Sequence, residues 1–250
     1  MAEDFRRDER LPDPVMAAHH AYPTPTGTVL SSLHGVSKAY RNPAETTRVF
    51  EDLDLELHRG EITCLVGPSG CGKSTVISLI AGLMRPDSGR VSFDGQDLAQ
   101  LSDTERAHLR GTRVGIVLQS GNLVPFLSAA ENVALAARLA GADCSPARVL
   151  GSLERVGLAD RADHLPRRLS GGEAQRAALA VALVNSPDLL LADEAVGQLD
   201  SSTARLVMGA MELACREQGL GVLLVTHSPD VAALASRVVR LVDGRLEEAA

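Results

Sequence analysis

The chain has 250 residues, of which 45% are hydrophobic and only 2% aromatic, and its formal net charge is −7. This length allows one large domain, or one domain with an inserted subdomain, around an aliphatic core. The acidic balance argues against non-specific nucleic-acid binding, which needs a basic face. No apolar stretch reaches the roughly 18 residues that span a bilayer. The four cysteines form no Cys-x-x-Cys pair, which favours a reduced chain without disulfides or zinc.

Residues 1–28 differ in composition from the rest of the chain. The segment begins with mixed charges and no apolar run, so it does not resemble a signal peptide. It continues with Pro12, Pro14, Pro23 and Pro25, and proline both fixes φ and lacks a backbone donor. The sequence therefore predicts a disordered tail over 1–28 and a folded domain over 29–250.

Three strands are expected in the first part of that domain. Residues 29–36 form the first, and residues 53–57 alternate leucines with acidic residues, which predicts a half-exposed strand. Residues 62–66 are apolar and partly β-branched, as is typical of a buried strand. The helical spacing of apolar residues after position 75 predicts a helix behind this third strand.

Residues 67–75 read Gly-Pro-Ser-Gly-Cys-Gly-Lys-Ser-Thr and match the pattern G-x-x-x-x-G-K-[ST]. Their place between a predicted strand and a predicted helix is that of a phosphate-binding loop. Glycines let successive N–H groups converge on an anion, and the helix N-terminus adds positive potential. We expect Lys73 to bind the β- and γ-phosphates and Ser74 to ligate Mg²⁺. The alternative is a glycine-rich turn that binds nothing.

Helices and strands alternate through the rest of the chain. Strands are expected at 90–93, 113–118, 188–192, 221–226 and 237–242. Such alternation implies an α/β fold with a mostly parallel sheet covered on both faces. A helix that begins near Ser201 is expected to pack through Leu206, Ala210 and Leu213.

Three Ser-x-x-Glu pairs predict capping boxes at helix starts. They are Ser102 with Glu105, Ser128 with Glu131 and Ser170 with Glu173. The third pair opens a long Ala-rich helix and includes two glycines, which would allow a close approach of the backbone to an anion. A well-capped helix without any ligand is the alternative interpretation of that pair.

Polar residues follow several of the predicted strands. Gly67, Gln119, the pair Asp193-Glu194 and His227 all come directly after one. Ligands bind at the carboxyl ends of strands in such sheets, so these residues are expected at one site. A carboxylate at Asp193 suits Mg²⁺, and Glu194 is the natural general base for a water that attacks the γ-phosphate.

With the run Leu169-Ser170-Gly171-Gly172-Glu173, the chain resembles the ATP-binding subunit of an ABC transporter over about residues 29–246. The resemblance implies an α/β P-loop NTPase core with a mixed, mostly parallel sheet and an inserted helical subdomain at about 120–175. It also implies ATP hydrolysis with ATP and Mg²⁺ as cofactors, in a head-to-tail homodimer. Each site would use the phosphate loop of one chain and residues 170–173 of the other.

The resemblance also implies a role for each matching residue. Catalysis would use Glu194, His227, Gln119 and Lys73. The implied Mg²⁺ ligands are Ser74, Gln119 and Asp193. The implied nucleotide contacts are Tyr40 on the adenine, the loop residues Gly67, Pro68, Ser69, Gly70, Cys71, Gly72, Lys73, Ser74 and Thr75, together with Gln119, Ser170, Gly171, Gly172, Glu173 and Asp200.

The segments at 119–126 and 131–133 resemble the lipoprotein-release and macrolide-efflux type of ABC ATPase, which drives a separate membrane permease from the cytoplasmic face of the cell membrane. The chain departs from that type at Ala195-Val196, where Pro-Thr is usual, at Gln198, where Asn is usual, and at Gly121, where an aromatic residue is usual. Two alternatives are a soluble ABC ATPase that acts on DNA or ribosomes and a nucleotide-dependent regulator. The acidic charge and the intact Glu194 and His227 argue against them, and no nucleic-acid partner is expected.

Overall fold

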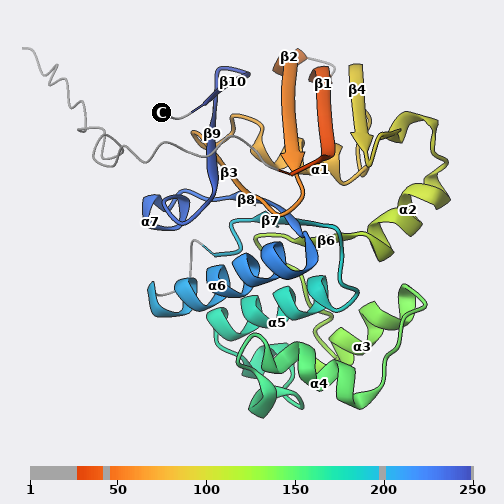
Figure 1. Ribbon diagram of the computed structural model, residues 1–250, viewed down its shortest axis with the longest axis vertical. Helices are drawn as coiled ribbons and strands as arrows, with labels where there is room; N and C mark the ends of the chain where they lie inside the picture. Colours follow the sequence, from red (N-terminus) through yellow and green to blue (C-terminus); the bar gives the residue numbers. More distant parts are fainter. Residues whose placement is uncertain (1–26, 42–45, 197–200, 249–250) are drawn as a thin grey trace, which may run out of the picture.

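The computed structural model describes residues 27–41, 46–196 and 201–248 (Figure 1). The predicted tail at 1–28 lies almost entirely outside the described residues, as do Gln198 and Asp200. Within the described part of the chain, no helix combines the length and the apolar composition needed to cross a membrane.

A six-stranded sheet forms the centre of the fold, with the strand order β10-β9-β3-β8-β7-β6. All neighbouring pairs in it are parallel except β10 with β9. The predicted mostly parallel sheet is thereby confirmed. Its strands are β3 (Ile62–Val66), β6 (Val114–Val117), β7 (Leu189–Asp193), β8 (Gly221–Val225), β9 (Arg237–Val242) and β10 (Arg245–Glu248).

A second sheet is antiparallel and has the order β2-β1-β4-β5. Sequence alone did not separate it from the first, and its strands extend beyond the predicted ranges. They are β1 (Val29–Arg41), β2 (Thr46–His58), β4 (Ser88–Phe93) and β5 (Gln96–Asp97). The β4–β5 hairpin turns at Asp94-Gly95, where both residues have positive φ, as a two-residue type I′ turn requires.

The parallel strands are buried on both faces, and each face packs into its own core. On β7, Leu190 and Ala192 join the core shared with the helices at the lower end of Figure 1. Leu189 and Leu191 join the core shared with the antiparallel sheet. This two-sided burial explains why the strand sequences read as continuous apolar runs.

The α-helices are α1 (Lys73–Ile80), α2 (Asp103–Thr112), α3 (Ala129–Leu139), α4 (Pro146–Glu154), α5 (Gly171–Leu183), α6 (Ser201–Gln218) and α7 (Pro229–Ala232).

The three predicted capping boxes are all present, at the N-termini of α2, α3 and α5. In each, the serine hydroxyl accepts from the backbone N–H of the glutamate, and that glutamate accepts from the N–H of the serine. The motif is local, which is why sequence alone predicts it.

The predicted packing face of α6 is wrong. Leu206 and Leu213 are 73% and 54% exposed. The buried stripe is a different one, made of Ala204, Val207, Met208, Met211 and Cys215. Both sets have helical spacing, so periodicity alone does not choose between them, and the stripe with more apolar side chains is the one that faces the core.

A network of ion pairs joins the two sheets at the end of the fold opposite the phosphate loop. Asp188, just before β7, accepts from Arg59 at 2.8 Å and from Arg113 at 2.6 Å. Asp94, in the β4–β5 turn, pairs with the same two arginines at 3.4 and 2.8 Å. Arg113 also lies 4.9 Å from the centroid of the Phe93 ring.

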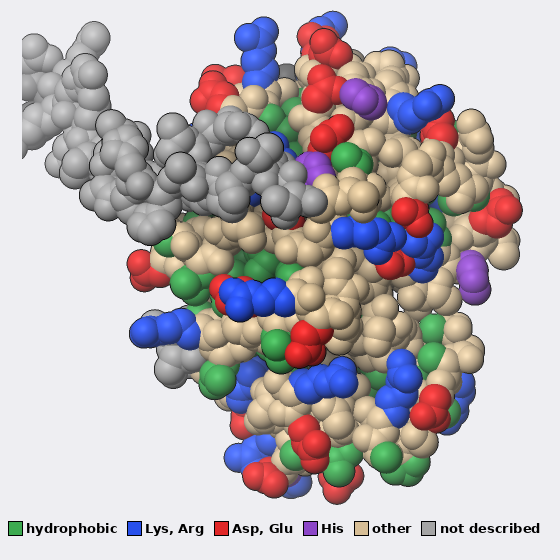
Figure 2. Space-filling model, in the orientation of Figure 1, with side chains coloured by type: hydrophobic (Ala, Val, Ile, Leu, Met, Phe, Trp, Pro, Cys, Tyr) green, Lys and Arg blue, Asp and Glu red, His purple; other side chains and the backbone are tan. Residues whose placement is uncertain are grey.

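On the face seen in Figure 2, basic and acidic side chains are interspersed, and neither sign of charge gathers in one patch.

We predict that Asp188→Asn lowers the free energy of unfolding by about 1 kcal/mol at pH 7, because the partly exposed network loses its central charge. Burial by itself raises the pKa of Asp188, but the hydrogen bonds from Arg59 and Arg113 outweigh it and hold this pKa below its ordinary value. The stabilisation by the Asp188 charge is therefore complete above about pH 4, and it is lost as the pH falls through the pKa of Asp188 in the folded state. Chemical denaturation at several pH values measures the effect.

The matched control is Glu212→Gln, which removes an exposed pair with Arg216 at 4.0 Å and should change stability less. Equal losses for the two variants at pH 7 would contradict a special role for the network.

Candidate functional site

The residues predicted to act together follow β3, β6, β7 and β8, and these strands are neighbours in the sheet order β3-β8-β7-β6. Their carboxyl ends therefore meet along one edge. Residues 67–72 connect β3 to α1, and residues 73–75 of the motif form the first turn of α1, as predicted for a phosphate-binding loop. Gln119 is exposed, two residues beyond β6.

The glycines of this loop are required by the backbone and by the space around it. Gly70 and Gly72 have φ of 80° and 106°, in the left-handed region. A Cβ on Gly72 would lie 2.4 Å from the Val49 side chain, and one on Gly67 would lie 2.3 Å from the Leu241 carbonyl oxygen. A larger residue at either position would push neighbouring strands away from the loop.

Lys73, the first residue of α1, is only 7% exposed. Its Nζ donates to the carbonyl oxygens of Gly67 at 2.9 Å and Pro68 at 2.7 Å. The loop thus curls around the ammonium group, which places a positive charge where N–H groups and the helix N-terminus also favour an anion.

Ser74 and Asp193 meet across the edge of the sheet, since Ser74 Oγ donates to Asp193 Oδ2 at 2.7 Å. A hydroxyl and a carboxylate in contact are hard oxygen ligands of the kind that Mg²⁺ takes from a protein, with phosphate and water completing its shell. Among the described residues, no group of three or more His, Cys, Asp or Glu side chains could hold a metal ion by itself. The donor set is thus suited to a metal shared with a phosphate.

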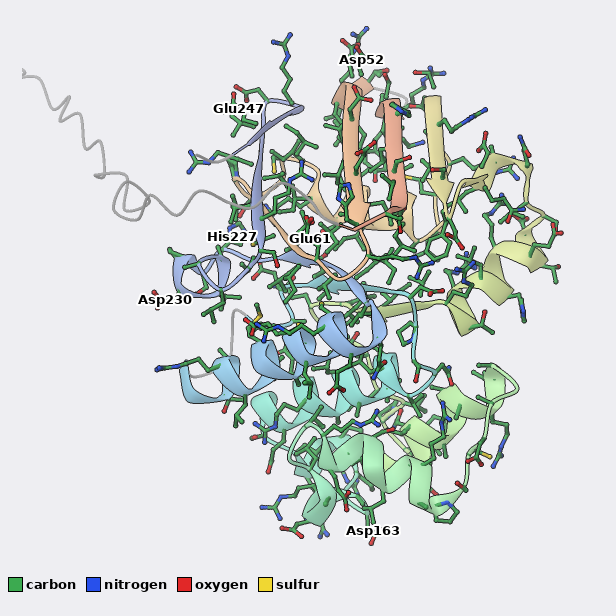
Figure 3. The ribbon with its side chains drawn as sticks, viewed as in Figure 1. Asp52, Glu61, Asp163, His227, Asp230 and Glu247 are labelled. Carbon is green, nitrogen blue, oxygen red and sulfur yellow. The ribbon has the colours of Figure 1, made fainter. Side chains whose placement is uncertain are left out.

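Glu194 follows β7 with φ of 54°, in the left-handed region that non-glycine residues rarely adopt. Its side chain is 15% exposed, and Oε1 lies 3.3 Å from Nε2 of His227. That Oε1 atom is buried and accepts no hydrogen bond, an arrangement that suits a water or substrate proton. Figure 3 shows His227 on the segment that leads into α7.

Tyr40 lies near the end of β1 and is 43% exposed. Its hydroxyl lies 3.1 Å from Thr75 Oγ1 and donates to Met84 Sδ at 3.7 Å. These contacts fix an aromatic ring beside the start of α1, within reach of the loop.

Residues 170–173 are engaged in their own helix start. Ser170 Oγ accepts from the Glu173 N–H at 3.2 Å, and Glu173 accepts from the Ser170 N–H at 2.8 Å and from Arg161 at 3.0 Å. The hydrogen bond from the Ser170 N–H, followed by that from Arg161, lowers the pKa of Glu173 to about 2. Among the described residues, no hydrogen bond joins residues 170–173 to the phosphate loop.

Two residues near the site were missed by sequence reasoning. Arg161 pairs with Glu173, which lies twelve positions later in the chain, and Gln175 donates to the Glu194 carbonyl oxygen at 3.2 Å. No local pattern signals either contact. The unusual pair Ala195-Val196 is 5% and 0% exposed, so it is anchored by apolar burial.

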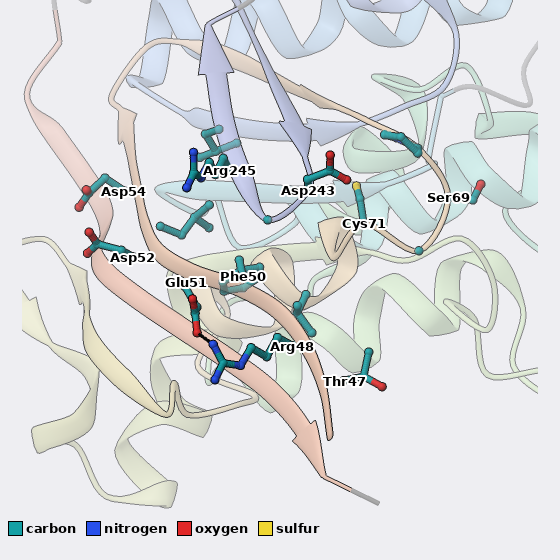
Figure 4. A pocket seen from close by; sticks show the side chains of 16 residues that line it. Thr47, Arg48, Phe50, Glu51, Asp52, Asp54, Ser69, Cys71, Asp243 and Arg245 are labelled. Atoms are coloured by element: carbon teal, nitrogen blue, oxygen red, sulfur yellow. Dashed lines mark hydrogen bonds and ion pairs between the residues drawn. The ribbon is translucent and has the colours of Figure 1, made fainter. Parts of the chain in front are cut away.

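A groove of about 1020 Å³ opens beside the phosphate loop (Figure 4). It is lined by residues 47–54 of β2, residues 68–71 of the loop and residues 243–246 of the β9–β10 hairpin. Lys73, Ser74, Asp193 and Glu194 are not among the lining residues, so the groove does not include the contact of Ser74 with Asp193.

Comparison with known proteins agrees with this geometry. Residues 50–197 match the model of the ABC transporter family. A lipoprotein-releasing system ATP-binding protein, LolD 2 of Caulobacter vibrioides, is 42% identical over 86% of this chain and 96% of its own length. The macrolide export ATP-binding/permease protein MacB of Syntrophobacter fumaroxidans is 40% identical over 87% of this chain but only 31% of its own length.

Among solved structures, a dimeric ATP-binding cassette in a post-hydrolysis state, bound to ADP and Pi, superposes with a TM-score of 0.82 and 35% identity. The match covers 88% of this chain and 98% of that one. The predicted resemblance to the lipoprotein-release and macrolide-efflux type is confirmed by these relatives, which lend no support to a DNA- or ribosome-directed ATPase. The chain therefore belongs to the ABC transporter family, as an ATP-binding and ATP-hydrolysing subunit.

Proposed function

We propose that two copies of this chain bind ATP head to tail and drive a separate membrane permease from the cytoplasmic face of the cell membrane. The observation that carries the proposal is the pair of contacts at neighbouring strand ends, Ser74 with Asp193 and Glu194 with His227. The first pair provides metal and phosphate ligands, and the second provides a base with a nearby imidazole.

Within one chain, the loop at 67–75 holds the phosphates through its N–H groups and Lys73, and Tyr40 stacks on the adenine. Ser74, Gln119 and Asp193 would hold Mg²⁺, which would supply positive charge beside the phosphates when bound. Glu194 accepts the proton of the attacking water through its carboxylate. His227 lies within reach of that carboxylate and contacts the γ-phosphate.

Two observations support a composite site. The start of α5 makes its hydrogen bonds at 170–173 within the helix and with Arg161, so its outward N–H groups remain suited to a phosphate from elsewhere. A solved relative, matched over 98% of its own length, is a dimer. We propose that Ser170, Gly171 and Gly172 bind the partner's γ-phosphate, that Glu173 mainly fixes the helix start, and that Asp200 faces the partner.

The permease is proposed as a separate chain. MacB carries an ATP-binding part and a permease part in one protein, and this chain matches only 31% of its length. The helical region at about 120–175, which we propose as an inserted subdomain, and the exposed Gln119 beside it would contact that permease.

Glu194→Gln should retain ATP binding and lose at least about 100-fold in turnover, because the base is lost while the phosphate loop is intact. Steady-state phosphate release and equilibrium binding of a fluorescent ATP analogue measure the two quantities. The matched control is Glu61→Gln, which alters a carboxylate that is 9% exposed, next to Thr63 at the start of β3, and should keep its turnover. Wild-type turnover in Glu194→Gln would show that another group is the base.

Tyr40→Ala should weaken ATP binding by about 1–3 kcal/mol, the contribution of one base–aromatic stack. Tyr40→Phe separates the ring from its hydroxyl, which contacts Thr75, and should retain most of the affinity. GTP should compete nearly as well as ATP, since stacking does not distinguish base edges. Equal losses in both variants, measured by titration calorimetry, would assign the affinity to the hydroxyl instead of the ring.

A mixing experiment tests the composite site. Lys73→Ala and Ser170→Ala homodimers should both be inactive, but a mixed dimer contains one site with two intact residues. Random mixing makes half of the dimers mixed, so about a quarter of wild-type sites should reappear. If hydrolysis needs two good sites, this quarter is an upper limit, so ATP-dependent dimer formation on a sizing column is scored in parallel.

Ser102→Ala and Ser128→Ala are the controls, because they remove the same type of cap from α2 and α3. Each should cost about 1 kcal/mol of stability, as Ser170→Ala should, while turnover is retained. If mixing restores no activity and also produces no mixed dimers, the head-to-tail arrangement is contradicted.

A further inference from the structure

The backbone of Glu194 needs support, because a residue with a Cβ is unfavourable at φ of 54°. Two hydrogen bonds provide that support from opposite sides. The Glu194 N–H donates to the Val225 carbonyl oxygen on β8 at 3.0 Å. The Glu194 carbonyl oxygen accepts from Gln175 Nε2 on α5 at 3.2 Å.

The chain after Glu194 is fastened to the same helix. Ala195 and Val196 are 5% and 0% exposed, in the core that also contains Leu179 of α5. Apolar packing fixes where this segment lies. Because the hydrophobic effect is non-directional, this packing does not orient a peptide plane. The Gln175 amide is directional, so it is the contact that sets the peptide following Glu194.

We propose that Gln175 is a positioning residue that holds the left-handed backbone of Glu194 and thereby keeps the Glu194 carboxylate beside His227. The inference rests on the proposed function, in which Glu194 is the general base. Without the donor, the Glu194 carbonyl is released and φ can relax toward the ordinary negative region, which rotates the side chain away from His227. Gln175 acts on the Glu194 of its own chain, even though α5 begins with the residues proposed to bind the partner's phosphate.

The first test is Gln175→Met, which keeps the length of the side chain and removes its donor. Turnover should fall at least about tenfold, since small displacements of a reacting group are costly, while the KM for ATP stays within about twofold. The matched control is Asn185→Leu, which removes amide donors to the Gly111 and Ala136 carbonyl oxygens at 3.1 and 3.2 Å. It should lower thermal stability like Gln175→Met but leave kcat unchanged. Unchanged kcat in Gln175→Met, or the same loss in Asn185→Leu, would overturn the proposal.

The second test asks whether the effect passes through Glu194. In a Glu194→Gln background, Gln175→Met should cause no further loss of turnover, because the base is already absent. A further tenfold loss would assign Gln175 a different role. If Glu194→Gln itself turns over normally, the proposed base is wrong; if it is inactive while Gln175→Met is normal, only the present inference fails.

The third test asks in which chain Gln175 acts. Mixing Gln175→Met with Ser170→Ala gives one site per mixed dimer that combines an intact phosphate loop, Glu194 and Gln175 from one chain with an intact Ser170 from the other. About a quarter of wild-type activity should therefore appear above the residual rate of Gln175→Met alone. Mixing Gln175→Met with Lys73→Ala should give no such gain. The reverse pattern would show that Gln175 acts on the partner's site and would overturn the proposal.

Discussion

The hydrogen bond between the Ser74 hydroxyl and the Asp193 carboxylate is the contact on which the site depends. It joins the start of α1 to the end of β7, two elements separated by more than a hundred residues of chain. The bond is possible because β3 and β7 both run parallel to β8, which lies between them. Their carboxyl ends therefore lie on one edge, where each delivers the residues that follow it.

The two cores explain why this edge is held in place. One core packs the antiparallel sheet and α1 against one face of the parallel strands, and the other packs α5 and α6 against the opposite face. Glu194 is held by the parallel sheet and by a helix that covers it. Its N–H donates to Val225 of β8, and its carbonyl oxygen accepts from Gln175 of α5. The unfavourable backbone conformation of Glu194 persists because these contacts with the sheet and the helix together determine it.

The three capping boxes show that a local motif does not by itself indicate function. Ser102, Ser128 and Ser170 make the same hydrogen bonds at the starts of α2, α3 and α5. The third differs by its two glycines and by Arg161, which binds the Glu173 carboxylate. We propose that the third motif binds a phosphate because small residues surround it and leave N–H groups that an anion can approach.

The sequence by itself determined what depends on neighbouring residues: the phosphate loop, the buried strands, the capping boxes and the polar residues at strand ends. Only the tertiary structure decided which strands pair, that β1, β2 and β4 form a sheet of their own, and that α6 buries Val207 and Met211 rather than Leu206 and Leu213. It also decided the contacts of Arg161 with Glu173, of Gln175 with Glu194 and of Asp188 with two arginines. Each of these joins residues distant in sequence, and their partners are set by how the layers pack, which no local pattern encodes.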